Sequence, residues 1–347
     1  MDDPFESRSS GHRGRMVDWC GHCLVELESR ELRLRISSNR GAEIQQLLHK
    51  PTDTELMWSG HPAIVRNEVA PPSVNRVEGN FLDHFSGGWQ VVLPTAHSPT
   101  TYRGASFGQH GEAALLPWSI QVTCDDPERL EVVFTVELRN APLLVERRIG
   151  LKGATVSVAE RVTNLGSTAH DVQWGQHITF AGEALPAGTT LSVGGSPQIA
   201  VPQLSSPSYR FAPGITEWPT VRRVDGTHED ASLLGPDDGT DGHLIVGPLA
   251  VGEVLVRPPS HLPALTLSWD ANVHPFCWFW EVLGGYDAWP LWGRHRLVAI
   301  EPFNVPVETL TESIEGGRAT SIAPGATIAN IFRLTAHTQE LHEDSAR

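Results

Sequence analysis

The sequence lacks the segments that mark membrane and secreted proteins. No apolar run approaches the roughly 20 residues of a membrane-spanning helix, and the polar N-terminus MDDPFESRSSGHRGR has no apolar core of a secretory signal. Basic residues are few, 26 against 41 acidic ones, and the formal charge of −15 argues against nucleic acid as a partner. We therefore expect no membrane or nucleic-acid partner, a disordered lead-in at residues 1–16, and a single domain at 17–340.

Cysteine is scarce as well. The chain of 347 residues has four cysteines, Cys20, Cys23, Cys124 and Cys277, too few to stabilise a fold of this size by disulfide bonds. This favours the cytoplasm as the compartment. The CGHC motif that starts at Cys20 resembles a thiol oxidoreductase motif, but that chemistry needs its first cysteine at a helix N-terminus. Here the motif precedes a stretch with strand character, and no second CxxC or HxxxH completes a zinc site. We expect neither a metal nor a cofactor.

Strand patterns dominate the chain. In ELRLRIS (31–37) and LEVVFTVELRN (130–140), apolar residues recur at every second position. The 32 glycines and 26 prolines interrupt such segments every few residues. The sequence predicts an all-β fold of two large packed sheets. GAEIQQLLHK (41–50) has helical spacing of its apolar residues and stays open as a helix, and the Pro- and Ser-rich region Leu185–Thr220 predicts loops.

Three ionisable residues occur in unusual surroundings. His177 lies within the apolar and aromatic stretch WGQHITFAG (174–182), His110 follows Gln109 in a glycine-flanked polar turn, and Glu301 ends the apolar strand LVAI before a proline. Taken singly, they could be a satisfied core histidine, a turn cap and a solvated strand end. Together, a histidine and a carboxylate of this kind form the pair that general acid–base catalysis requires.

Tryptophan is abundant, eleven residues against three tyrosines. Flat indole faces pack well on the C–H faces of sugar rings, although large cores also use tryptophan. The composition and the acid–base pair together favour a cleft enzyme with a carbohydrate-like ligand. Nine of the eleven are singled out: Trp58, Trp89, Trp118, Trp174, Trp269, Trp278, Trp280, Trp289 and Trp292.

The order of several motifs resembles the aldose 1-epimerase (galactose mutarotase) superfamily, near its hexose-6-phosphate-epimerase-like branch. The matching segments fall in order between Val17 and Thr338: SNRGAEIQQLLHKPTDTELMW, GGWQVVLP, QHGEAALLPW, WGQHITF and VAIEPFN. This resemblance implies a supersandwich of two extended antiparallel sheets with the sugar site on a concave face. It also makes GAEIQQLLHK a strand rather than a helix.

The resemblance implies roles for individual residues. Glu301 resembles the general base, His177 the general acid, and His110 the histidine that hydrogen-bonds the sugar. Trp89 and Gln176 are expected to contact the sugar as well. The implied reaction interconverts the α and β anomers of a free hexose by opening the ring at C1–O5. We then expect His177 and Glu301 to converge within about 8 Å.

Two departures from the family pattern bear on the substrate. In the hexose-6-phosphate branch an arginine precedes the paired glycines, whereas Ser86 stands there in this sequence. A phosphosugar is thereby disfavoured, with Arg103 or Arg66 as possible replacements. The family also has an aspartate that grips sugar hydroxyls. The candidates are Asp237, Asp238, Asp241 and Asp270, and Asp270 is the one we expect.

Other functions of the same fold stay open. A non-catalytic sugar-binding protein would keep the tryptophans without needing an acid–base pair, and a hexose-6-phosphate 1-epimerase would share the chemistry. A glycoside hydrolase would usually need two carboxylates about 5–10 Å apart, and no second carboxylate stands in a comparable motif. The expected partner is a monosaccharide, and the expected state is a monomer or a homodimer.

Overall fold

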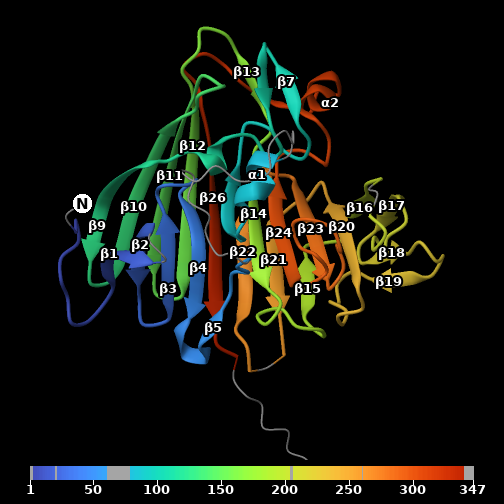
Figure 1. Cartoon of the computed structure of the whole chain (residues 1–347), viewed down its shortest axis with the longest axis horizontal. Coiled ribbons are helices and arrows are strands. Elements are labelled where there is room, and N and C mark those ends of the chain that lie inside the picture. Colours follow the sequence, from blue (N-terminus) through green and yellow to red (C-terminus); the bar gives the residue numbers. More distant parts are fainter. Residues whose placement is uncertain (1–2, 20–21, 61–78, 204–205, 260, 340–347) are drawn as a thin grey trace, which may run out of the picture.

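Two large antiparallel sheets lie face to face in the computed structural model, which describes residues 3–19, 22–60, 79–203, 206–259 and 261–339 (Figure 1). Cys20, and with it the CGHC motif as a unit, lies outside the described residues. The predicted all-β sandwich of large antiparallel sheets is confirmed.

The first sheet contains twelve strands among the described residues. Its order runs from β1 at one edge to β17 at the other, and β5 (Thr54–Glu55) pairs with β4 beside this path. The strands are, in sheet order, β1 (Arg13–Trp19), β2 (His22–Glu28), β3 (Leu32–Ser37), β4 (Glu43–His49), β6 (Gly88–Val92), β14 (Gly175–Ala181), β24 (Arg296–Phe303), β23 (Phe276–Leu283), β20 (Thr240–Val246), β16 (Gln198–Val201) and β17 (Gly214–Glu217).

The second sheet contains eight strands in the described part of the chain. The last strand in sequence, β26, lies near its centre. The strands are, in sheet order, β15 (Thr190–Val193), β21 (Gly252–Arg257), β22 (Ala264–Trp269), β26 (Thr327–His337), β12 (Thr155–Asn164), β11 (Leu143–Lys152), β10 (Arg129–Glu137) and β9 (Ser119–Asp126).

Short elements complete the described fold. Three two-stranded ribbons pair β7 (Thr100–Tyr102) with β8 (Ala105–Phe107), β13 (His170–Val172) with β25 (Thr320–Ile322), and β18 (Thr220–Arg222) with β19 (His228–Asp230). The helical segments are α1 (Gly79–His84), α2 (Leu310–Glu315), η1 (Lys50–Thr52) and η2 (Ala113–Leu115). No helix in the described ranges has the length and apolar composition needed to cross a bilayer.

The core lies between the two sheets because the strands alternate apolar and polar residues. In β10, Leu130, Val132 and Phe134 are fully buried, as their spacing predicts. GAEIQQLLHK contains the whole of β4, and only its last residue, Lys50, belongs to η1, so its strand interpretation is confirmed. The region Leu185–Thr220 differs from the expected loops, because β15, β16 and β17 all form there.

The N-terminal residues are more structured than the sequence predicts. Strand β1 starts at Arg13 rather than near Val17. Ahead of it, Phe5 packs against Gly14, where any Cβ would lie 2.1 Å from the Phe5 ring. Arg8 pairs with Asp125. Residues 3–16, for which the sequence predicts a disordered lead-in, make side-chain contacts with the domain in this structure.

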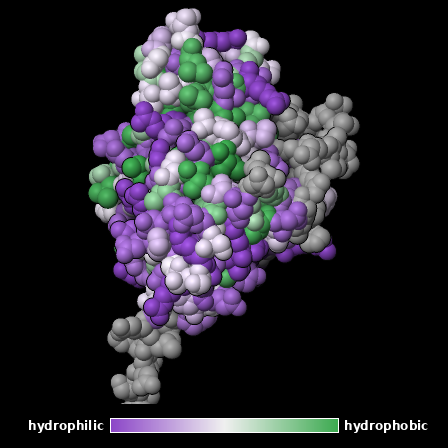
Figure 2. Space-filling model, turned by 90° about the vertical axis from the view of Figure 1, so that its left-hand side faces the viewer, coloured by the Kyte–Doolittle hydropathy of each residue, from purple (hydrophilic) through white to green (hydrophobic). Residues whose placement is uncertain are grey.

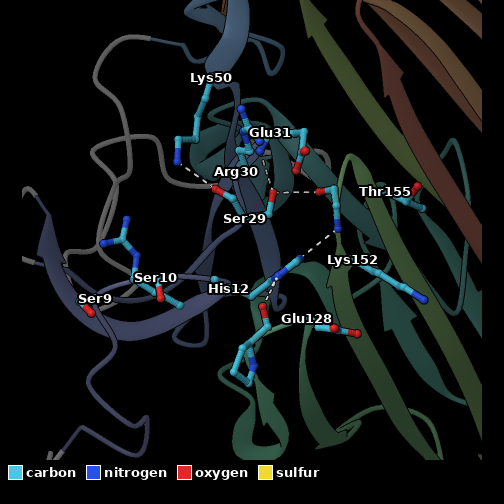
Figure 3. A pocket seen from close by; sticks show the side chains of 14 residues that line it. Ser9, Ser10, His12, Ser29, Arg30, Glu31, Lys50, Glu128, Lys152 and Thr155 are labelled. Carbon is cyan, nitrogen blue, oxygen red and sulfur yellow. Dashed lines mark hydrogen bonds between the residues drawn. The ribbon is translucent and has the colours of Figure 1, made fainter.

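His12 also anchors this segment, at a cavity of about 830 Å³ formed with the hairpin turns of both sheets (Figure 3). Its Nδ1 lies 2.9 Å from the carbonyl oxygen of Pro127, and its Nε2 accepts a hydrogen bond of 3.0 Å from the Gly153 N–H. The side of the molecule that carries β1, β9 and β10 is largely hydrophilic, with scattered apolar groups (Figure 2).

Candidate active site

His177 and Glu301 lie side by side on neighbouring strands of the first sheet. Thr179 of β14 pairs with Ala299 of β24, so the antiparallel register places His177 and Glu301 opposite each other and on the same face. His177 Nε2 lies 3.9 Å from Glu301 Oε1. The predicted convergence of the two side chains is confirmed.

This pair opens onto a cavity of about 480 Å³, within the usual size of small-molecule sites. Strand side chains form its floor, and α1 together with several loops forms its walls. Besides His177 and Glu301, the lining comprises Phe81, Leu82, Phe85, His97, Ser98, Pro99, Gln109, His110, Ser206, Tyr209, Asp241, His243, Trp278, Trp280, Tyr286 and Pro290.

Aromatic rings surround His177. The ring centroids of Phe85 and Trp280 lie 5.2 and 5.9 Å from the imidazole centroid, and that of Phe81 lies 6.1 Å away. Such rings exclude water and offer flat faces to the C–H groups of a sugar. Trp280 was among the tryptophans singled out in the sequence. Phe81 and Phe85 were missed because no strand or helix pattern marks them as lining a cavity.

Burial controls the charge of the acid–base pair. It lowers the pKa of His177 to about 3 and raises the pKa of Glu301 well above its ordinary value. Both shifts favour the uncharged forms of the two groups. His177 Nδ1 lies 3.0 Å from Thr179 Oγ1, and this contact leaves Nε2 for Glu301 and a ligand.

His110 also lines the cavity. Its backbone is left-handed at φ 60°, and Gly111 follows at φ 73°, where a Cβ would lie 2.3 Å from the Leu93 carbonyl oxygen. The turn therefore fixes the imidazole, whose centroid lies 5.6 Å from that of His177. His110 Nδ1 is buried without a hydrogen-bond partner among the described residues, so it is free to bind a ligand hydroxyl.

Asp241 is the aspartate that lines the cavity. Its Oδ1 accepts a hydrogen bond of 3.0 Å from the Ser206 hydroxyl and another from Ser208. His243, two residues further along β20, lines the same cavity, and burial lowers its pKa to about 3. The sequence signal for His243 was its position two residues from Asp241 on a strand, which places both side chains on one face; His243 was not among the predicted site residues.

The remaining aspartates lie elsewhere, which corrects the expectation for Asp270. Asp270 follows β22 of the second sheet, where its carboxylate accepts hydrogen bonds from Asn272. Asp237 pairs with Arg296, and Asp238 accepts a hydrogen bond from Thr240.

Trp89 and Gln176 face away from the cavity. Both are fully buried between the sheets, and Trp89 Nε1 donates a 2.9 Å hydrogen bond to Gln176 Oε1. Gln176 precedes His177 on β14, and adjacent strand residues point to opposite faces. The expectation that Trp89 and Gln176 contact a sugar is therefore wrong.

Lysine and arginine are absent from the described lining of the cavity. Ser86 stands where the hexose-6-phosphate branch of the epimerases has an arginine, and it accepts a hydrogen bond from the buried Arg40. Arg103 donates to Thr168 outside the cavity, and Arg66 lies outside the described residues. In the described part of the chain, no cluster of His, Cys, Asp or Glu has the arrangement to hold a metal ion.

The larger cavity of Figure 3 has a different character. Phenylalanine, tyrosine and tryptophan are absent from its described lining, and Lys50 there already pairs with Glu28. The aromatic cavity with its buried acid–base pair is therefore the candidate active site.

Comparison with known proteins extends this picture. The profile of a family described as a domain of unknown function (DUF4432) matches residues 20–336. No protein of curated function matches the chain in sequence.

Solved structures show the likeness in fold. A Klebsiella pneumoniae protein provisionally named an aldose 1-epimerase superimposes with a TM-score of 0.74 at 15% identity, covering 96% of this chain and 85% of its own. A galactose mutarotase related enzyme from Lactobacillus acidophilus gives 0.60 at 18% identity, covering 91% and 98%. A galactose mutarotase-like protein from Clostridium acetobutylicum gives 0.60 at 10% identity, covering 95% and 99%. The predicted galactose mutarotase-like supersandwich is confirmed.

Proposed function

Because the chain belongs to the DUF4432 family and has a galactose mutarotase-like fold, we propose that it is an aldose 1-epimerase-like enzyme acting on a free, uncharged hexose. The observation that carries this proposal is the 3.9 Å approach of His177 Nε2 to Glu301 Oε1 at the floor of an aromatic cavity. A sugar-binding protein without catalysis has no need of two buried titratable groups in contact.

The chemistry needs one proton donor and one proton acceptor. Glu301 takes the proton from the anomeric hydroxyl while His177 protonates the ring oxygen, so the C1–O5 bond breaks and C1 becomes an aldehyde carbon. Rotation about C1–C2 exposes the other face, and ring closure reverses both transfers. Each group thus serves once as acid and once as base. Before and after ring opening, Glu301 and His177 together carry one titratable proton, first on His177 and then on Glu301.

The pKa shifts match one of the two states in this cycle. When Glu301 has accepted its proton and His177 has given one up, both groups are uncharged, as burial favours. In the other state both are charged, and their mutual attraction at this short separation offsets part of the desolvation cost. The exchange of one proton between the two states accompanies ring opening and closure.

The surroundings of the pair favour an uncharged sugar. A phosphate or carboxylate group would enter a cavity whose described lining offers no lysine or arginine to it. Asp241 can accept hydrogen bonds from sugar hydroxyls, and His110 Nδ1 lacks a partner that a hydroxyl could supply. Trp280 and Tyr286 supply flat aromatic surface.

Polarimetry of freshly dissolved α-glucose and α-galactose tests the proposal. The protein should accelerate mutarotation above the spontaneous rate, and free hexoses at millimolar concentration should raise the melting temperature. Activity at background on every aldose, combined with stabilisation by sugars, would favour the non-catalytic binding protein. Stabilisation by hexose 6-phosphates alone would favour the phosphosugar epimerase.

A further inference from the structure

The sheet ladder is interrupted where the acid–base pair lies. Strand β14 pairs with β24 at Gly175–Phe303 and again from Thr179–Ala299 onward, but not between these points. Pro302 has no backbone N–H to donate in this interval. His177 is therefore held by the ladder on the β6 side alone, where it pairs with Gln90.

A buried network of hydrogen bonds links the second sheet to this segment of β14. Arg147 of β11 and Glu160 of β12 form an ion pair in which both side chains are fully buried. Gln176 donates from Nε2 to Glu160 Oε2 at 2.8 Å and accepts from Arg147 Nη1 at 3.2 Å. The residue directly before His177 is thus bonded to both members of the pair.

The same network holds both sides of the segment. Trp174 Nε1 donates to Glu160 Oε2 at 2.8 Å, and Arg147 Nη2 donates to the carbonyl oxygen of Trp89 on β6 at 3.3 Å. Trp89 in turn donates to Gln176. Two strands of the first sheet are therefore fixed against two strands of the second, directly beneath His177.

Stability alone gives a weak reason for such a pair. Removing two charges from water is costly, and apolar residues of similar volume often stabilise a protein as well or better. The geometric order that an ion pair imposes is different, because each hydrogen bond fixes a direction. At a catalytic group, a misplacement of about 1 Å can cost on the order of a hundredfold in rate.

We propose that Arg147 and Glu160 are positioning residues that act through Gln176 to fix His177 against Glu301 where the strand ladder does not. This inference rests on the proposed function for its kinetic consequence, but its structural content, the orientation of the His177 ring, is independent of any substrate.

The test removes the pair without leaving an unpaired charge. The variant Arg147→Met with Glu160→Leu should fold, and its kcat for mutarotation should fall by about ten- to a hundredfold with little change in KM. The matched control is Arg148→Met with Glu131→Leu, a partly exposed pair on β11 and β10, which should keep the wild-type kcat.

Two further measurements make the outcome decisive. Gln176→Met keeps the ion pair and cuts its link to β14, so it should lower kcat in the same way even if the double variant does not fold. The ¹⁵N chemical shifts of the His177 imidazole, assigned with His177→Asn, should change in Gln176→Met and not in the control. Unchanged kcat and unchanged shifts in Gln176→Met would overturn the positioning role. A wild-type protein without mutarotase activity would contradict the proposed function alone, since the shifts still report on positioning.

Discussion

Replacing Glu301 by glutamine separates the cost of burying its carboxyl group from its proposed chemical role. Burial raises the pKa of Glu301 well above its ordinary value near 4.5, so the folded protein holds this proton to higher pH than the unfolded chain does. The corresponding stabilisation is fully present below the unfolded pKa and is lost as pH rises toward the folded pKa. The loss amounts to roughly 1 kcal/mol for each pH unit in that interval.

Glutamine has the shape of the protonated acid and does not ionise. Glu301→Gln should therefore have nearly wild-type stability at pH 4.5 and become progressively more stable than the wild type as the pH rises. Its kcat should fall by about 10²–10⁴-fold, because no group then takes the proton of the anomeric hydroxyl.

Urea denaturation at pH 4.5, 6 and 8, with polarimetry at pH 7, measures both effects. Glu137→Gln, at an exposed site on β10, is the control and should show neither. A stability difference that stays constant with pH would refute the burial argument. A kcat close to the wild-type value would remove Glu301 from the mechanism.

Three further results are expected. His177→Asn should lower kcat steeply with KM less affected, since the ring oxygen loses its proton donor; polarimetry over a range of sugar concentrations separates the two constants. Burial lowers the pKa values of His177, His243 and His274 to about 3. The free energy of unfolding should therefore fall as the pH drops below 6.5, by roughly 1 kcal/mol per pH unit for each histidine. Urea titrations at pH 7, 6 and 5 measure this fall. Gly111→Ala should destabilise the fold and weaken hexose binding, because its Cβ would lie 2.3 Å from the Leu93 carbonyl oxygen; thermal melts with and without hexose measure both.

The alternation of apolar residues was enough to predict the sandwich and the buried faces of its strands. The same alternation argues against the expectation that both Gln176 and His177 contact the sugar. The two residues are adjacent on a strand, so their side chains point to opposite faces and cannot both face one ligand. Trp89 could not be placed in this way, because only its pairing with Ile178 on β14 shows that it shares the inner face.

Choosing among the aspartates required contacts between segments far apart in sequence. Asp241 lines the cavity because β20 lies beside β23, which in turn lies beside β24 with Glu301. The order of strands across a sheet is not encoded in local periodicity. The same limit applies to the N-terminus, where the contact of Phe5 with Gly14 has no local signature.

The central position of β26 has a consequence for biosynthesis. Thr327–His337 pairs with β22 on one side and β12 on the other, so the two halves of the second sheet meet in this strand. The ribosome delivers it after every other strand of the sheet has been made. Until then β12 and β22 present unpaired edges, the kind of surface that promotes association between nascent chains. The second sheet can therefore be completed only when β26 joins its two halves.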